Sequence, residues 1–152
     1  MTLTRGKLIK ISLITIFIAV WAYRSFLYID IAHGCYVKIL PSLTEWSAPK
    51  TIKSALKILE RTVPDEYERT CTRVRTINPN VSCGSFEGGC FINSKSTARS
   101  IDISTSQRSL AWTAAVIVHE TCHAWQAYED RPFSEFECNT NGDRVLNTIV
   151  EI

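Results

Sequence analysis

Neither sign of charge dominates the sequence. Its 17 basic and 15 acidic residues leave a net charge of +2, which is too small to indicate a nucleic-acid surface, so we predict no nucleic-acid partner. Internal repeats and low-complexity tracts are also lacking, and 152 residues suffice for one compact domain with an appendage. No C-x-x-C pair occurs among the six cysteines, which disfavours a four-cysteine zinc site.

One long apolar run is present, close to the start of the sequence. Basic residues lead into apolar residues over 8–23, and apolar residues 26–29 continue the run. This pattern is typical of a signal peptide or a signal anchor over residues 1–30, and we favour an uncleaved anchor because no clean small-x-small cleavage triplet is present. The basic start predicts a cytoplasmic N-terminus, anchorage in the inner or cytoplasmic membrane, and an extracytoplasmic body, periplasmic or at the cell surface.

All of the cysteines follow this apolar segment: Cys35, Cys71, Cys83, Cys90, Cys122 and Cys138. Their even number and an exported compartment favour disulfide bonds. Cys83 and Cys90 bracket a short loop with a Gly-Gly pair, for which we predict a hairpin stapled by a disulfide between them.

The remaining pattern predicts an α+β fold. Residues 31–66 are expected to form a connector with an amphipathic helix over 49–61. The domain proper is expected over 67–152. Short strands are predicted over 67–77, 91–92 and 101–104.

Two helices are predicted after these strands. The first starts at a cap, Thr105 or Ser106, and runs to about Tyr128. The second opens with Ser134 and Glu137 as an S-x-x-E capping box and runs to near the end of the sequence. Strands followed by two helices are typical of an α+β domain.

The motif His119-Glu120-Thr121-Cys122-His123 carries the chemistry. His119 and His123 are four residues apart on the first of these helices, so both imidazoles project from one face and can reach one Zn²⁺ ion. Glu120 lies to the side, where its carboxylate can take a proton from a water molecule and deliver it to a leaving amine. This is the H-E-x-x-H pattern.

Residues 116–126, VIVHETCHAWQ, resemble the active-site helix of zincin metallopeptidases, and the resemblance covers 101–150, about a third of the chain. Because no histidine follows His123, the metzincin subgroup is excluded, and the resemblance is to gluzincins of minigluzincin size. It implies a small zincin-like domain with a short β-sheet, an active-site helix and a following glutamate helix. It also implies a zinc metallopeptidase that acts on a peptide or protein substrate.

In gluzincins the third zinc ligand is a glutamate on the next helix, in an E-x-x-x-D or E-x-x-x-N setting. Glu135 and Glu137 both satisfy this pattern. At 100° per residue, Glu135 and Asn139 share a stripe with Leu146, which marks that stripe as inward. We therefore choose Glu135, keep Glu137 as the alternative, and expect Asn139 to support or pack against the ligands.

The resemblance also bears on the other cysteines. Cys122 and Cys138 stand where relatives often carry a small residue, at the expected closest approach of the two helices, so a disulfide between them would clamp the ligand helices. The alternative is a cysteine ligand, although Cys122 is turned away from the two histidines. Cys35 and Cys71 are then left as the third pair.

Three functions fit these residues. The first is a zinc metallopeptidase with Glu120 as general base and acid; the others are a non-catalytic zinc-stabilised envelope or binding protein, and a zinc hydrolase of a non-peptide amide. Two further hypotheses rest on position alone. Residues 36–66 would cover the cleft as a prosegment, and 101–104 would be the edge strand that aligns a peptide substrate.

Overall fold

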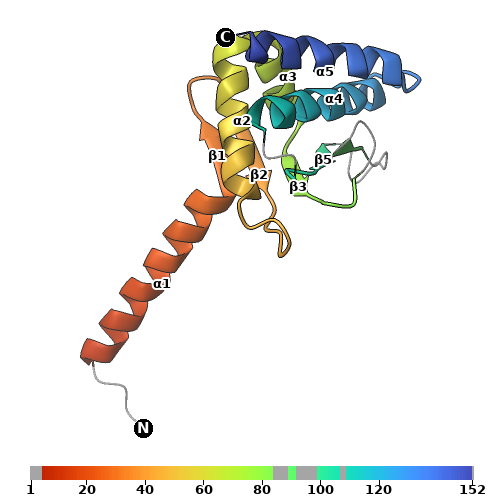
Figure 1. The fold of residues 1–152 in the computed structure, drawn as a ribbon. Coiled ribbons are helices and arrows are strands. Elements are labelled where there is room, and N and C mark those ends of the chain that lie inside the picture. The colour runs from red at the N-terminus through yellow and green to blue at the C-terminus, as the bar shows by residue number, and fades with distance from the viewer. Residues whose placement is uncertain (1–4, 84–88, 92–98, 107–108, 152) are drawn as a thin grey trace.

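The protein consists of a long N-terminal helix and a body in which helices pack on a small sheet (Figure 1). The computed structural model describes residues 5–83, 89–91, 99–106 and 109–151. In this part of the chain the elements are α1 (Arg5–Phe26), β1 (Leu27–Asp30), β2 (Cys35–Ile39), α2 (Ala48–Thr62), α3 (Pro64–Arg73), β3 (Thr76–Pro79), β4 (Gly89–Cys90), β5 (Ser100–Ile103), α4 (Leu110–Tyr128) and α5 (Glu135–Val150). The predicted α+β class is confirmed.

The sheet is mixed, with its strands in the order β1-β2-β3-β5-β4. Neighbouring strands are parallel from β2 through β3 to β5, and β1 and β4 pair antiparallel at the two ends. β5 confirms the strand predicted over 101–104. It is not an edge strand, however, because Gly89 and Cys90 of β4 pair with Ile103 and Asp102 on its outer side. The expectation that 101–104 forms the sheet edge is therefore wrong.

One buried apolar cluster joins the sheet to α2 and α4. Ile39 of β2, Leu56 of α2, Ile101 of β5 and Ile117 of α4 are all fully buried, and burying side chains of this size stabilises the fold by about 1.5–3 kcal/mol each. Residues 31–66, expected as a connector, thus contribute a strand and a helix to the same core as the rest of the domain. Their burial is not compatible with a detachable prosegment.

The helix predicted over 49–61 is confirmed by α2, but the strand predicted over 67–77 is largely wrong. Most of that stretch belongs to α3, and only its end belongs to β3. Pro64 does end α2, and it also occupies the first position of α3, where a missing N–H costs nothing. Asp65 and Glu66 in the first turn complement the helix dipole. These start signals outweigh the alternation of Thr, Val and Arg that suggested a strand.

The apolar start of the chain forms α1, which projects from the body as a single rod (Figure 1). Lys7–Phe26 is long and apolar enough to cross a membrane by length and composition, and none of it is buried in the protein. Of the apolar residues 26–29, only Phe26 belongs to this helix. Leu27–Asp30 instead pair with β2, and Tyr28 is buried, so the helix ends before residue 30.

The start of α4 also differs from the expectation. Ser109, rather than Thr105 or Ser106, caps the helix, and its Oγ accepts a hydrogen bond from the Trp112 N–H at 3.3 Å. Residues 107–108 lie outside the described residues. The predicted end at Tyr128 is confirmed. Ser134 caps α5 as predicted, since its Oγ accepts from the Glu137 N–H at 3.3 Å.

The three predicted disulfides are present. Cys35–Cys71 joins β2 to α3, Cys122–Cys138 joins α4 to α5, and Cys83–Cys90 closes a separation of 7 residues. The described part of the chain contains no free cysteine. Residues 84–88 and 92, which belong to the predicted hairpin and strand, lie outside the described residues.

The first prediction concerns the disulfide between the sheet and α3. Cys35–Cys71 spans 36 residues and both side chains are buried, so C35A/C71A should lower the free energy of unfolding by about 4 kcal/mol on the chain-entropy relation. C83A/C90A, the matched control, should lower it by about 2 kcal/mol because its loop is shorter. Chemical denaturation of both variants measures the difference, and equal losses would contradict this ranking.

Candidate metal centre

Two histidines of the H-E-x-x-H motif face each other inside the protein. His119 and His123 lie one turn apart on α4, a helix buried along most of its length, and are only 1% and 5% exposed. Their Nε2 atoms are 3.1 Å apart, with the ring planes at 76°. The predicted common face is therefore present, and both ring nitrogens point at the same small volume.

Glu135, the first residue of α5, completes this cluster. Its carboxylate oxygens lie 3.5 Å from His119 Nε2 and 3.3 Å from His123 Nε2. The ligand atoms of the three residues all lie within 4.8 Å of one another and could hold a metal ion. Because the Glu135 side chain is 66% exposed, the cluster is open to solvent on the α5 side.

Glu137, the alternative ligand, points elsewhere. Its two oxygens accept hydrogen bonds from the Arg131 guanidinium at 3.0 and 3.2 Å, and one of them also accepts from Gln126 Nε2 at 3.1 Å. The hydrogen bonds from Arg131 hold the Glu137 pKa below its ordinary value. Glu137 thus does not form the expected capping-box hydrogen bond with its carboxylate. It forms an ion pair with Arg131 instead, which keeps the carboxylate away from the histidines.

The inward face of α5 coincides only in part with the predicted stripe, which also contains Gly142 and Ile149: Gly142 is buried and Ile149 packs against the core. Cys138, Gly142 and Val145 are the buried residues of the helix, whereas Leu146 is only half-buried. Glu135 reaches the histidines because it is the first residue of α5, next to the end of α4. Asn139 is partly buried, and among the described residues its Oδ1 has no hydrogen-bond partner.

Gln126, a residue that the motif does not include, orients His123. The Ser134 N–H donates to Gln126 Oε1 at 3.1 Å, and the same oxygen lies 3.2 Å from His123 Nδ1. A backbone N–H is always a donor, so the atom it faces must be the amide oxygen, and His123 Nδ1 must then carry the ring proton. His123 Nε2 therefore carries a lone pair directed at the cluster, where His119 Nε2 lies 3.1 Å away. Gln126 lies three residues after the second histidine of the motif, and this spacing is the sequence signal that could have identified it.

Glu120 is buried beside the same cluster. It is 1% exposed, its Oε1 lies 3.8 Å from His119 Nε2, and neither oxygen accepts a hydrogen bond from a described residue. Gly89 of β4 approaches it so closely that a Cβ there would lie 2.1 Å from Glu120 Oε1. The lack of a side chain at Gly89 thus makes the room for Glu120, a role that the Gly-Gly hairpin pattern did not reveal.

Burial shifts the charge states of this site toward the neutral forms. It raises the pKa of Glu120 to about 8, with further contributions from the negative charges of Glu135 and Asp102. It lowers the pKa of His119 to about 4, assisted by His123. Neutral imidazole is the form that binds a metal ion, and a cation next to Glu120 favours its ionised form.

An aromatic wall borders the histidines. The Phe133 ring lies 5.7 Å from that of His123, and the Phe91 ring lies 5.9 Å from that of Phe133. Phe133 precedes the cap of α5 and Phe91 follows β4, so segments distant in sequence meet here. Neither residue could be predicted as part of the site, because the strand pattern at 91–92 does not show which side chains meet the histidines.

The donor set fits a divalent cation. The lone pair of His123 Nε2 faces a carboxylate oxygen at 3.3 Å, and two acceptors at this distance repel each other unless a cation lies between them. Two imidazoles and one carboxylate are ligands that Zn²⁺ accepts in sites with an open fourth position. Zinc itself stays a prediction.

A second group with metal-ligand atoms consists of Asp30, His33 and Glu60. His33 Nδ1 lies 2.7 Å from Asp30 Oδ2, and the Tyr67 hydroxyl donates to the same carboxylate at 2.8 Å. The hydrogen bond to Asp30 raises the pKa of His33. These contacts describe an ordinary ion pair at the surface, since His33 is more than half exposed.

Comparisons with protein-family models, with curated proteins and with solved structures found no match for this chain. The resemblance to zincins therefore rests on the motif and on the residues that the fold gathers around it.

The second prediction separates the two glutamates. Glu135→Ala removes a proposed ligand and should weaken Zn²⁺ binding by more than about 100-fold. Loss of a residue that only hydrogen-bonds to a ligand typically weakens metal binding by roughly 10- to 100-fold. Glu137→Ala, the matched control two residues away, should retain stoichiometric zinc. Metal analysis and competitive chelator titration measure both variants, and loss of zinc in Glu137→Ala alone would move the third ligand to Glu137.

The third prediction concerns the orientation of His123. Gln126→Ala removes the acceptor that fixes the His123 tautomer and should weaken Zn²⁺ binding roughly 10- to 100-fold. Glu137→Ala again serves as the control, because it removes another partner of Gln126 and leaves the contact with His123. Unchanged zinc affinity in Gln126→Ala would show that the ring is held by other contacts.

Proposed function

We propose that this protein is a membrane-anchored or exported zinc metallopeptidase that hydrolyses peptide bonds. The observation that carries the proposal is the convergence of His119, His123 and Glu135 beside a buried glutamate whose oxygens have no described hydrogen-bond partner. Burying such a carboxyl without a partner is costly. Costs of this kind are concentrated at functional sites.

Glu120 is the proposed general base and acid. Its Oε1 lies 3.8 Å from His119 Nε2, so a water molecule in the open part of the cluster would lie within hydrogen-bond reach of this carboxylate. Glu120 would take a proton from that water as the scissile carbonyl is attacked, and it would return the proton to the leaving amine. The missing side chain of Gly89 leaves the space that this carboxylate occupies beside β4.

The residues that would hold the metal are His119, His123 and Glu135. When bound there, Zn²⁺ supplies a Lewis acid that polarises the carbonyl and makes water a better nucleophile. Gln126 keeps the lone pair of His123 directed at the site. The Cys122–Cys138 disulfide joins α4, between its two histidines, to α5 about one turn after Glu135.

The substrate is proposed to bind in an extended conformation along β4. Among the described strands, the sheet order puts β4, not β5, at this end of the sheet, beside which an extended peptide would lie. Phe91 and Phe133 would contact apolar side chains of the substrate beside the histidines.

The proposed compartment is extracytoplasmic. Three disulfides favour an oxidising environment, and the apolar helix α1 suits a membrane anchor or a signal sequence. Both features agree with an exported hydrolase.

The fourth prediction tests the chemistry. Glu120→Gln should retain stoichiometric Zn²⁺ and lower the rate of cleavage of an unstructured protein substrate by about a hundredfold or more. Glu129→Gln, an exposed glutamate just after α4, is the matched control and should cleave at the wild-type rate. Proteolysis assays with parallel metal analysis give both readings.

Two results would reject the peptidase. Full activity in Glu120→Gln would remove the proposed role of this residue. Stoichiometric zinc in the wild type with no cleavage of any peptide in a diverse library would instead identify the cluster as a structural metal site.

A further inference from the structure

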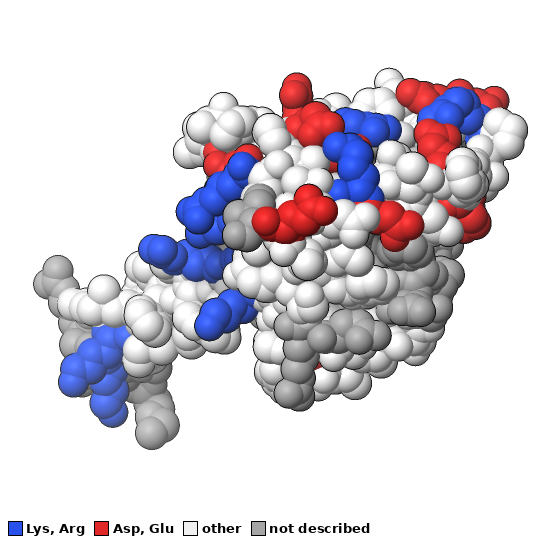
Figure 2. Space-filling view, turned by 45° about the horizontal axis from the view of Figure 1, so that its top comes forward, with Lys and Arg blue, Asp and Glu red and all other residues white. Residues whose placement is uncertain are grey.

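A cavity lies where α1 meets the body of the protein, away from the candidate metal centre. Its volume is about 540 Å³, and it is bounded by the last turns of α1, the segment 41–46 and residues 49–57 of α2. Four basic residues line it: Arg24, Lys50, Lys53 and Lys57. No acidic residue is among the described residues that line it. Figure 2 shows Lys and Arg side chains gathered where the rod joins the body.

The cations of this cavity repel one another. Lys53 Nζ donates a hydrogen bond to the backbone carbonyl of Arg24, which brings α2 against the end of α1. Burial lowers the pKa of Lys53, and the positive charges of Arg24 and Lys57 lower it further. An anion in the cavity would reverse this repulsion and would accept hydrogen bonds from several of these side chains.

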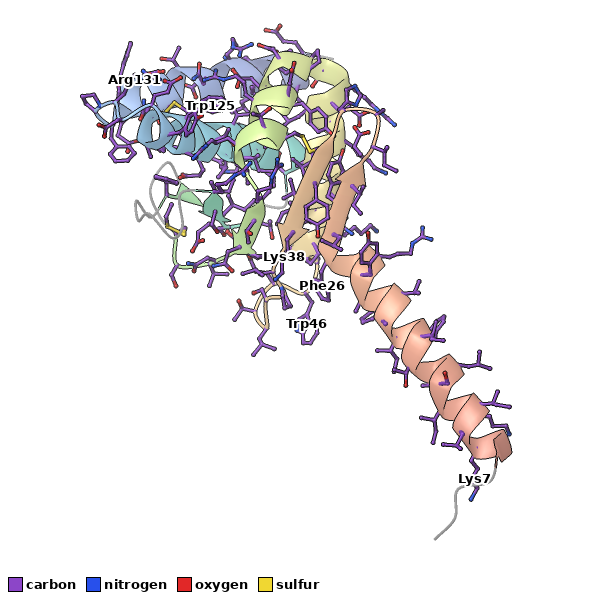
Figure 3. All side chains as sticks on the ribbon, turned by 180° about the vertical axis from the view of Figure 1, so that it is seen from behind. Lys7, Phe26, Lys38, Trp46, Trp125 and Arg131 are labelled. Atoms are coloured by element: carbon purple, nitrogen blue, oxygen red, sulfur yellow. A yellow bond between two sulfur atoms is a disulfide. The ribbon has the colours of Figure 1, made fainter. Side chains whose placement is uncertain are left out.

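Large apolar side chains stand next to the cations. Leu43 and Trp46, in the segment between β2 and α2, are 85% and 81% exposed, and Trp21 of α1 is 60% exposed. All three line the cavity. Figure 3 shows Trp46 and Phe26 at the same end of the body, where α1 leaves it. Tryptophan beside Lys and Arg at the end of an apolar helix is the composition of a membrane interface.

We propose that this cavity binds the phosphate headgroup of an anionic phospholipid in the membrane that α1 spans. The basic side chains contact the phosphate, while Trp46 and Leu43 enter the interfacial layer beside α1. The proposal rests on α1 as a membrane anchor and is independent of the metal centre.

The consequence is a fixed orientation of the body on the membrane. A single anchor helix permits rotation of the body, whereas a second contact at Trp46 restricts it. In Figure 3, Arg131 lies at the end of the body farthest from Trp46 and α1. The loop that joins α4 to α5, and with it the open side of the metal centre at Glu135, would then face away from the bilayer.

The first experiment measures lipid binding by the full chain in a non-ionic detergent. Phosphatidylglycerol should bind more tightly than phosphatidylcholine in a native mass-spectrometry titration, and K53Q/K57Q should weaken its binding about tenfold or more. R61Q/R131Q is the matched control: it removes the same charge from exposed residues outside the cavity and should bind within about twofold of the wild type. A circular dichroism spectrum confirms that each variant is folded.

Three outcomes would overturn the proposal. They are equal binding of the two lipids, equal losses in the two double variants, and displacement of phosphatidylglycerol by equimolar inorganic phosphate. The last result would identify a soluble phosphate compound as the ligand instead of a lipid.

A second experiment measures how deeply the Trp46 side chain enters the membrane, and it does not depend on the lysine variants. In vesicles of brominated phosphatidylglycerol, Trp46→Phe should reduce the lipid-quenched part of the tryptophan emission. Trp125→Phe, the control at the far end of the body, should leave that quenched part unchanged. An undiminished quenched part in Trp46→Phe would place this side chain in water and reject the interfacial contact.

Discussion

The candidate site depends on the contact between α4 and α5. Two of its possible ligands come from α4 and the third from the start of α5, so a small slide of one helix would separate them. Two restraints prevent this slide. The Cys122–Cys138 bond holds the backbones at a Cα separation of 5.4 Å. Gln126 also bonds both the N–H and the carbonyl of Ser134, which ties the end of one helix to the cap of the next. The disulfide bond and the buried amide of Gln126 thus both fix the position of α5 relative to α4.

The electrostatics of the site follow from its burial. His119 and Glu120 are almost completely removed from solvent, and removal from water favours the neutral form of each. For a histidine this is the ligand form, whereas for a glutamate it is the form that cannot accept a proton. A bound cation corrects the second effect without disturbing the first, because it attracts the ionised carboxylate and the imidazole lone pair alike. Metal binding and the proposed base are therefore coupled by charge.

Much of the helical structure could be predicted from the sequence, because helix periodicity and caps are local. The residues of α2, the end of α4 and the start of α5 at Ser134 follow from apolar spacing and from single cap residues. The stretch 67–77 shows the limit of this approach. Its alternation suggested a strand, yet Pro64 and the acidic first turn start a helix there. The order of β4 and β5 could not be predicted either, since pairing between strands depends on contacts between distant segments.

The sequence by itself determined the common direction of His119 and His123, because residues four apart on a helix always share a face. It likewise determined that an apolar helix starts the chain and that the cysteines follow it. Helix periodicity already favoured Glu135 over Glu137, but only the tertiary structure shows what each carboxylate contacts. Glu135 lies beside the two histidines, whereas the ion pair of Glu137 with Arg131, a residue of the preceding loop, turns that carboxylate away. The roles of Gln126, Gly89 and the aromatic wall also became evident only in the tertiary structure. Each role depends on a contact with a residue from another segment of the chain.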